Sequence, residues 1–277
     1  MGARVHKSVR FFSGILLITT GLLGFMGGER PASAALAFQL VQQNDALRDA
    51  RKFASEGRKA FQEKNWEKAL EAFNASLRLH AQQPYILNAR GVTYLNLQRL
   101  DSAISDFKAC IQQLPENALP YFNLGNAYRL QKKLPEAIDA YSRAISLNAV
   151  YTAAYNNRGI SYSELKKYDR ALLDYNQSLK LNPRDLDVRN NRGYLYLLQK
   201  EYVKALQDFN AVLRKNPKHA LAYGNKAQVL YQQGQCEAAA QLLDTSCELG
   251  NVKACRAARR ISCEEKKPEP SASPSEK

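Results

Sequence analysis

One interval of 34 residues recurs along most of this chain. Glycine returns at this interval, and alanine continues the same column once more, at Gly57, Gly91, Gly125, Gly159, Gly193 and Ala227. Twelve residues after each position stands an alanine: Ala69, Ala103, Ala137, Ala171, Ala205 and Ala239. Four residues further on is an aromatic or large apolar residue: Phe73, Phe107, Tyr141, Tyr175, Phe209 and Leu243. Such regular self-similarity is typical of chains that stack similar units.

Each unit predicts a helical hairpin, because two stretches with helical apolar spacing flank a polar turn such as Gln131-Lys132-Lys133. A glycine inside a helix costs about 1 kcal/mol relative to alanine, so its recurrence indicates that a facing helix leaves no room for a side chain. Prolines that end the second helix follow three of the units, at Pro115, Pro183 and Pro217. We therefore expect an all-α solenoid from about residue 50 to residue 263, without a sheet.

These columns resemble the tetratricopeptide repeat family, whose pattern is a helix–turn–helix unit of about 34 residues. The segments Lys68-Ala69-Leu70-Glu71-Ala72-Phe73 and Asn191-Arg192-Gly193-Tyr194-Leu195-Tyr196 match it closely. The resemblance implies a right-handed superhelical solenoid of six repeats, at residues 50–83, 84–117, 118–151, 152–185, 186–219 and 220–251. The first and last units depart from the pattern, as with Ala60 in place of an aromatic residue. Terminal repeats are often atypical, because each has only one neighbour.

The first 34 residues have the parts of an export signal. Basic residues precede an apolar stretch at 11–26, and Ala32-Ser33-Ala34 provides a small-x-small cleavage site. We expect a signal peptide over residues 1–34, an exported protein that is periplasmic or secreted, and a short leader segment at residues 35–49. The alternative is an uncleaved anchor facing the periplasm, since residues 11–28 reach the lower length limit for crossing a bilayer.

The C-terminal end carries two segments outside the repeats. Basic residues alternate with apolar ones over residues 252–263, which predicts an amphipathic helix that caps the stack. Residues 264–277 are polar and rich in proline, so we expect them to be disordered.

Four of the five cysteines lie near this cap, and export favours disulfides. The fragment from Cys247 to Cys255 resembles the paired cysteines of cysteine-rich helical repeats in secreted bacterial solenoids, which implies a bridge. If two antiparallel helices meet between these residues, Cys236 and Cys263 also face one another as a second pair. The rival interpretation, a zinc site, lacks the close cysteine pairs that structural zinc uses. Cys110 occupies a column of small residues and is expected to be a buried free thiol.

No catalytic pattern stands out in the chain. Phosphate-binding loops, zinc-protease helices, nucleophile elbows and dinucleotide-binding loops are absent from the sequence. The three histidines, His6, His80 and His219, are scattered rather than paired at ligand spacing. We therefore expect a protein that is not an enzyme and that uses no cofactor or metal.

Asparagines recur on the first helix of the units, at Asn123, Asn157, Asn191 and Asn225, with Asn88, Asn156 and Asn190 one position earlier in their units. In tetratricopeptide superhelices the first helices line the concave groove. The resemblance implies that these amides grip the backbone of an extended peptide, because an amide both donates and accepts hydrogen bonds. The alternative is that they bond neighbouring helices within the stack. The same register places further groove residues, which could instead pack between helices, at Tyr85, Phe122, Asn126, Ile160, Tyr194 and Tyr231.

The expected function is a non-enzymatic protein–protein interaction module of the cell envelope, which binds a partner segment or helix in its concave groove and supports complex assembly. The alternative is a structural or self-associating scaffold of an envelope machine that uses convex or end surfaces. The formal net charge of +14 would attract nucleic acid, but export removes that ligand. The carboxylate clamp of some family members is not supported, because no lysine precedes the asparagine column. Membrane contact is expected only if the signal stays uncleaved.

Overall fold

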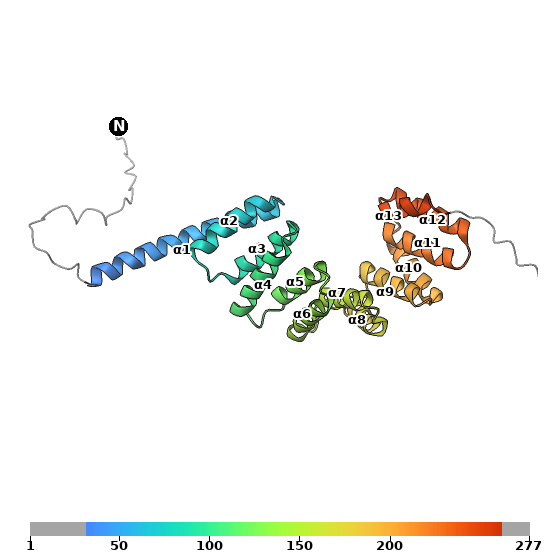
Figure 1. The fold of residues 1–277 in the computed structure, drawn as a ribbon, viewed down its shortest axis with the longest axis horizontal. Coiled ribbons are helices and arrows are strands. Elements are labelled where there is room, and N and C mark those ends of the chain that lie inside the picture. Colours follow the sequence, from blue (N-terminus) through green and yellow to red (C-terminus); the bar gives the residue numbers. More distant parts are fainter. Residues whose placement is uncertain (1–31, 262–277) are drawn as a thin grey trace, which may run out of the picture. The chain divides into compact units, whose positions relative to one another are not determined.

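The computed structural model describes residues 32–261. Within this range the chain forms α-helices and no β-strand (Figure 1). The all-α expectation is therefore confirmed for these residues. Most of the expected signal peptide (1–34) and the whole expected tail (264–277) lie outside the described range. Within residues 32–261, no helix combines the length and the apolar character that crossing a membrane requires.

The helices follow one another in pairs. The first helices of the pairs are α1 (Ala32–Gln62), α3 (Pro84–Asn96), α5 (Ala118–Leu130), α7 (Thr152–Glu164), α9 (Leu186–Leu198) and α11 (Ala220–Gln232). The second helices are α2 (Trp66–Leu79), α4 (Leu100–Gln113), α6 (Leu134–Leu147), α8 (Tyr168–Leu181), α10 (Tyr202–Lys215) and α12 (Cys236–Glu248). A short helix, α13 (Val252–Ala258), follows the sixth pair. Five of the first helices, α3 to α11, begin where the sequence places the start of a unit.

The glycine column sets how closely the two helices of a pair approach. A Cβ atom built on Gly91 would lie 2.6 Å from Cε1 of Phe107, and one on Gly125 would lie 2.6 Å from Cδ1 of Tyr141. Equivalent contacts occur at Gly57, Gly159 and Gly193. The alanine column on the second helices is fully buried from Ala69 to Ala239. The small residues therefore stand where the backbones meet, as the repeat pattern predicts.

The turn inside each pair contains a residue with left-handed backbone geometry. Its φ lies between 57° and 61° at five places that are 34 residues apart: Lys64, Gln98, Lys132, Lys166 and Lys200. The sixth place is Gly234, with a φ of 80°. A side chain makes this conformation about 1 kcal/mol costlier than it is for glycine. The turn geometry is therefore imposed by the packing of the two helices rather than by a glycine in each turn.

Serines near the end of three second helices form hydrogen bonds to the first helix of the same pair. Ser76 donates to the carbonyl oxygen of Ala50 at 2.8 Å, and Ser246 donates to that of Ala220 at 2.7 Å. Ser178 makes the equivalent bond in the fourth pair. Each bond satisfies a buried hydroxyl and joins the second helix to the first helix of its pair, at the first residue of that helix in the fourth and sixth pairs.

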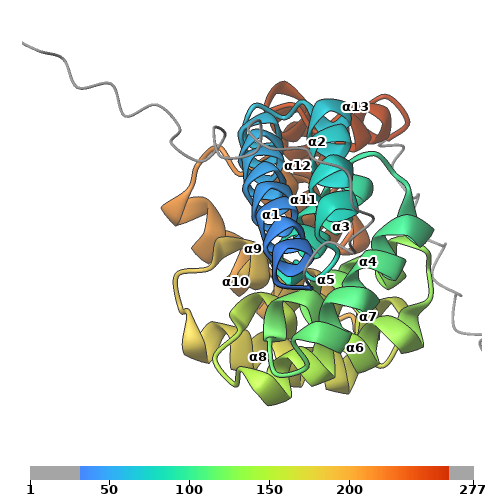
Figure 2. The same cartoon turned by 90° about the vertical axis from the view of Figure 1, so that its left-hand side faces the viewer.

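Neighbouring pairs stack side by side, with α4 against α5, α6 against α7, α8 against α9 and α10 against α11 (Figure 2). The first helices of successive pairs also contact one another from α3 to α11. Comparable contacts between successive second helices are not found in the described part of the chain. The first helices therefore lie on the inner side of the stack, and the second helices fan out on its outer side.

The chain divides into two units, residues 1–48 and residues 49–277, and the repeats belong to the second. In the first unit, the described residues belong to α1 and expose Leu36, Phe38, Leu40 and Val41. The expected leader at residues 35–49 is thus part of a continuous 31-residue helix. Its sequence contains no proline and a single glycine, Gly57, so nothing local ends the helix at the boundary we expected. The capping helix ends at Ala258, short of the expected residue 263.

Candidate functional site

The asparagines of the first helices form hydrogen bonds from one repeat to the next, and we call this set the asparagine ladder. Asn123 donates to Asn88 at 2.9 Å, and Asn191 donates to Asn156 at 3.1 Å. Asn225 donates to Asn190 at 3.1 Å in the same way. In each case Nδ2 of the later helix meets Oδ1 of the earlier helix. The alternative that these amides hold the stack together therefore has direct geometric support.

One step of the ladder follows a different route. Phe122 occupies the position that holds the accepting asparagine in the other pairs, and it packs its ring 4.9 Å from that of Tyr151. Asn126, one helical turn later, takes over the accepting role. It receives bonds of 2.8 Å from Asn157 Nδ2 and from the Tyr141 hydroxyl. The bond between the third and fourth repeats is thus kept although the sequence column is broken.

The ladder leaves hydrogen-bonding capacity unused. Each amide carries two N–H donors and an oxygen with two lone pairs, and an inter-repeat bond uses one donor and one lone pair. Asn190 accepts through Oδ1, and its Nδ2 has no hydrogen-bond partner among residues 32–261. Holding the stack and contacting a ligand are therefore compatible roles. That the ladder grips a peptide stays a prediction.

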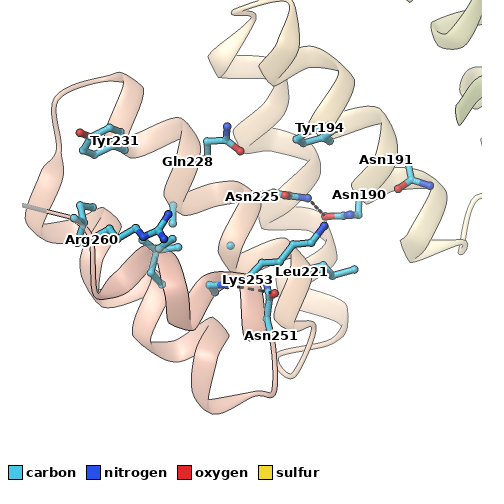
Figure 3. A pocket seen from close by; sticks show the side chains of 16 residues that line it. Asn190, Asn191, Tyr194, Leu221, Asn225, Gln228, Tyr231, Asn251, Lys253 and Arg260 are labelled. Atoms are coloured by element: carbon cyan, nitrogen blue, oxygen red, sulfur yellow. Dashed lines mark hydrogen bonds between the residues drawn. The ribbon is translucent and has the colours of Figure 1, made fainter. Parts of the chain in front are cut away.

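A pocket of about 740 Å³ gathers several of the expected groove residues at the C-terminal end of the stack (Figure 3). Asn190, Asn191 and Tyr194 come from α9, and Asn225 and Tyr231 come from α11. The exposed fractions of the two tyrosines are 39% and 50%, so their rings are open to solvent. Helix α13 completes the wall with Lys253, Ala254 and Ala257. Sequence reasoning did not anticipate that the capping helix lines this pocket.

The remaining expected groove residues lie elsewhere. Tyr85, at the start of α3, lines a second pocket of about 730 Å³ with Leu119 and Tyr151, beside the loops that join successive pairs. The structure does not bring Tyr85 together with Tyr194 and Tyr231, so the thirteen residues expected in one groove do not form a single pocket.

Buried arginine–aspartate pairs are a feature that sequence reasoning missed. Arg158 donates through Nε and a terminal nitrogen to both oxygens of Asp174, at 2.8 and 2.7 Å. Its other terminal nitrogen donates to Ser142 on the preceding repeat at 2.9 Å. The same geometry occurs at Arg90 with Asp106 and Asn74, and at Arg192 with Asp208 and Asn176. The readable signal is an arginine before three of the five column glycines, Gly91, Gly159 and Gly193, with an aspartate sixteen residues after each arginine.

The third repeat lacks both partners of this pair. It has Leu124 at the arginine position and Ala140 at the aspartate position, and both are buried. An apolar pair thus replaces the ionic pair as a unit, and no buried charge is left unpaired there.

The ionisable groups of the core are shifted in directions that suit structure rather than catalysis. The hydrogen bond that Arg90 donates to Asp106 raises the pKa of Arg90 against the opposing effect of burial, and the bond to Asp208 does the same for Arg192. Burial raises the pKa of Cys110 to about 11 and that of Tyr141 to about 12. A neutral thiol and a neutral phenol are poor nucleophiles near neutral pH. No group of three or more potential metal ligands occurs within residues 32–261.

The expected bridge between Cys247 and Cys255 is present, with the Cα atoms 4.6 Å apart. It connects the last turn of α12 to α13. Cys236 is also disulfide-bonded, and Cys263, its expected partner, lies outside the described residues. Cys110 is a free, buried thiol. Closing a loop of about eight residues contributes about 2.5 kcal/mol by the chain-entropy relation, which favours a fixed position of α13 against the last repeat.

Comparison with known families agrees with the repeat pattern. A family model described as tetratricopeptide repeat matches residues 118–149, 152–185 and 187–219. Two further models with the same description match residues 58–119 and 204–252. The matches cover the described repeats from the end of α1 to the start of α13.

Individual relatives are more distant. Small glutamine-rich tetratricopeptide repeat-containing protein 2 of Mycosarcoma maydis is 27% identical over 105 residues, which are 38% of this chain and 30% of that protein. The MamA crystal structure is 26% identical, with a TM-score of 0.56 over 62% of this chain and 94% of MamA. YrrB, a tetratricopeptide repeat protein with an unusual peptide-binding site, is 20% identical, with a TM-score of 0.54 over 70% of this chain and 100% of YrrB. The chain spans about a third or less of the curated relatives that it matches.

Proposed function

Because the chain belongs to the tetratricopeptide repeat family, we propose that it binds an extended segment of a partner protein along the face formed by its first helices. The family's fold is generally a non-enzymatic scaffold for protein interactions and complex assembly. The observation that carries the proposal is the pocket in which ladder amides lie beside the exposed rings of Tyr194 and Tyr231. Aromatic side chains next to unused amide groups are characteristic of surfaces that hold peptides.

The mechanism is preorganisation of the binding face. The ladder bonds connect the first helices from α3 to α11, and Arg–Asp pairs fix three of these helices, so this face is formed before a partner arrives. Little scaffold entropy is then lost on association, so more of the contact energy appears as affinity. The fold of YrrB, whose structure contains a peptide-binding site, supports the view that a stack of this kind can present such a site.

The location we propose is an exported one, in the periplasm or outside the cell. The support comes from the signal-like residues 1–34 and from the disulfide between Cys247 and Cys255, since oxidising compartments preserve such bonds. An uncleaved N-terminal anchor is the alternative within the same proposal. Edman sequencing of the protein purified from its native envelope decides between them, because a mature N-terminus at Ala35 requires cleavage.

A second candidate function is a scaffold that associates through its outer face. It is favoured by two apolar side chains on the second helices, Leu173 and Val203, which have exposed fractions of 70% and 69%. Neither side chain belongs to the pocket near α13. The two candidates therefore depend on different surfaces and can be separated by mutation.

The deciding experiment compares two double variants by co-purification with partner proteins from the native envelope. Tyr194→Ser with Tyr231→Ser changes the inner face, and Leu173→Ser with Val203→Ser is the matched change on the outer face. If the inner face binds the partner, the first variant loses the partner at unchanged thermal stability and the second retains it. The opposite pattern would refute groove binding and support the scaffold.

A further inference from the structure

The pocket beside α13 has an uneven charge distribution. Lys253 and Arg260 line it, and no aspartate or glutamate does. Figure 3 shows Lys253 extending from α13 toward Asn190. Arg260, which follows α13, lies on the same wall of the pocket. The described lining is thus cationic and rich in amides, although acidic residues are common elsewhere on the chain.

These two cations form no ion pair within the described fold. Neither Lys253 nor Arg260 has an ion-pair partner among residues 32–261, whereas Arg158 and Arg192 each hold a buried aspartate. Both side chains belong to exposed residues. Their charges are therefore available to a carboxylate that enters the pocket.

The rest of the lining suits the other parts of a peptide. Leu221 and Tyr231 are 55% and 50% exposed and offer apolar area. Asn190 and Asn225 are joined to each other, and within the described part of the chain they keep unused donors and acceptors for a peptide backbone. The volume of about 740 Å³ lies within the usual range for a ligand site.

The wall that carries the cations is held in place covalently and by hydrogen bonds. The Cys247–Cys255 disulfide joins α13 to α12, and Asn251 caps α13 while its Nδ2 donates to Ser246 at 2.9 Å. Lys253 stands within the disulfide loop. Lys253 is consequently positioned on a fixed wall, and Arg260 is tied to the end of α13 by the bond from its backbone N–H to the carbonyl oxygen of Ala257 at 3.0 Å.

We infer that this end of the groove selects an acidic segment of the partner protein, with carboxylates at Lys253 and Arg260 and an apolar side chain against Leu221 and Tyr231. The inference rests on the proposed function and specifies the chemistry of the segment that the groove holds. Charge complementarity favours a protein segment over nucleic acid or lipid, because the lining combines two cations with apolar and amide surface suited to side chains and a peptide backbone.

The test measures fluorescence anisotropy of a short, end-blocked peptide of alternating glutamate and leucine, titrated with the oxidised full chain. A second peptide has glutamine in place of every glutamate. We expect the glutamate peptide to bind about tenfold more tightly at low salt. Lys253→Gln with Arg260→Gln should lower the affinity for the glutamate peptide to that for the glutamine peptide. The affinity for the glutamine peptide should stay unchanged.

The matched control is Arg256→Gln with Arg259→Gln, which removes the same charge from the same cap at exposed residues outside the pocket lining. It should bind both peptides as the parent does. Equal weakening by the control would overturn the inference, because general attraction to the basic cap would then explain binding. Equal affinity for both peptides, lost on Tyr194→Ser with Tyr231→Ser, would also overturn it while leaving groove binding intact. Binding to anionic vesicles or to single-stranded DNA in preference to the glutamate peptide would overturn it as well.

Discussion

Replacing Gly91 by alanine tests the contact that sets the spacing within a helix pair. The new methyl group would lie 2.6 Å from Cε1 and 2.9 Å from Cδ1 of Phe107. Ordinary carbon contacts are about 3.5–4 Å long, so the ring or helix α3 must shift. Phe107 is fully buried in a close-packed core, so a shift of its ring also displaces neighbouring side chains.

The magnitude follows from two opposing effects. Alanine is favoured over glycine inside a helix by about 1 kcal/mol. Overpacking a close-packed core costs about 1–3 kcal/mol, and a contact this short against a buried ring belongs in the upper part of that range. We therefore expect Gly91→Ala to lower the free energy of unfolding by about 1–2 kcal/mol.

The sixth repeat shows how the clash can be relieved. There the column holds Ala227, and the facing residue is Leu243 instead of an aromatic residue. Gly91→Ala combined with Phe107→Leu copies this arrangement in the second repeat. Phe107→Leu alone leaves a cavity and should cost about 1–2 kcal/mol. The double variant should be less damaging than the sum of the two single variants by about 1–2 kcal/mol, because the methyl group fills the vacated space.

The assay is urea unfolding followed by far-ultraviolet circular dichroism, with the parent and the three variants measured together. Ala227→Gly serves as the mirror control and should lose about 1 kcal/mol, since no aromatic ring demands a glycine there. A Gly91→Ala variant as stable as the parent would refute the reasoning. Strict additivity in the double variant would do so as well.

Other parts of the fold yield three further predictions. Asp174→Ala leaves Arg158 largely buried without its carboxylate and should cost about 3 kcal/mol in urea unfolding, whereas Arg158→Leu with Asp174→Ala should recover most of this loss. Lys200 has a φ of 60°, so Lys200→Gly should raise the Tm and Lys200→Val should lower it. Unchanged Tm values would show that the left-handed backbone at this position costs no stability. Burial raises the pKa of Cys110 from 9.0 to about 11, so the fold favours the neutral thiol. This stabilisation is complete below about pH 9 and is lost as the pH rises toward 11. Between these pH values, the free energy of unfolding of Cys110→Ala should therefore fall less than that of the parent. Parallel plots of unfolding free energy against pH for the two proteins would contradict the raised pKa of Cys110.

The repeat columns could be predicted from sequence because every unit solves the same packing problem. A glycine that meets a ring in one pair meets a ring in the next, so five independent copies of Gly91 and Phe107 make the pattern visible. The asparagine ladder was visible for the same reason. Its partners were not, because Asn157 bonds Asn126 rather than the residue at the expected register. That exchange depends on where Phe122 packs, which a sequence does not state.

Other features could not be predicted from the sequence, for different physical reasons. The Arg–Asp pairs repeat in the sequence, but two charged residues sixteen positions apart are ordinarily solvated, and only the packed helices reveal that Asp174 is buried. Left-handed residues are usually sought at glycine or asparagine, so lysines such as Lys166 gave no signal. The pocket wall depends on how α13 folds back beside α11, which is a tertiary arrangement.

The geometry of the ladder also determines which mutations can report on binding. Asn191→Ala removes a group that lines the pocket beside α13 and also removes the 3.1 Å bond to Asn156 on the preceding repeat. A loss of stability and a loss of affinity are then expected together, and neither result would identify the role of the amide. Tyr194 lies on the same helix, three residues away; 39% of its surface is exposed, and its hydroxyl forms no hydrogen bond with any residue from 32 to 261. Its replacement changes the surface that a partner meets while the inter-repeat bonds persist, so the exposed tyrosines, rather than the asparagines, separate binding from folding.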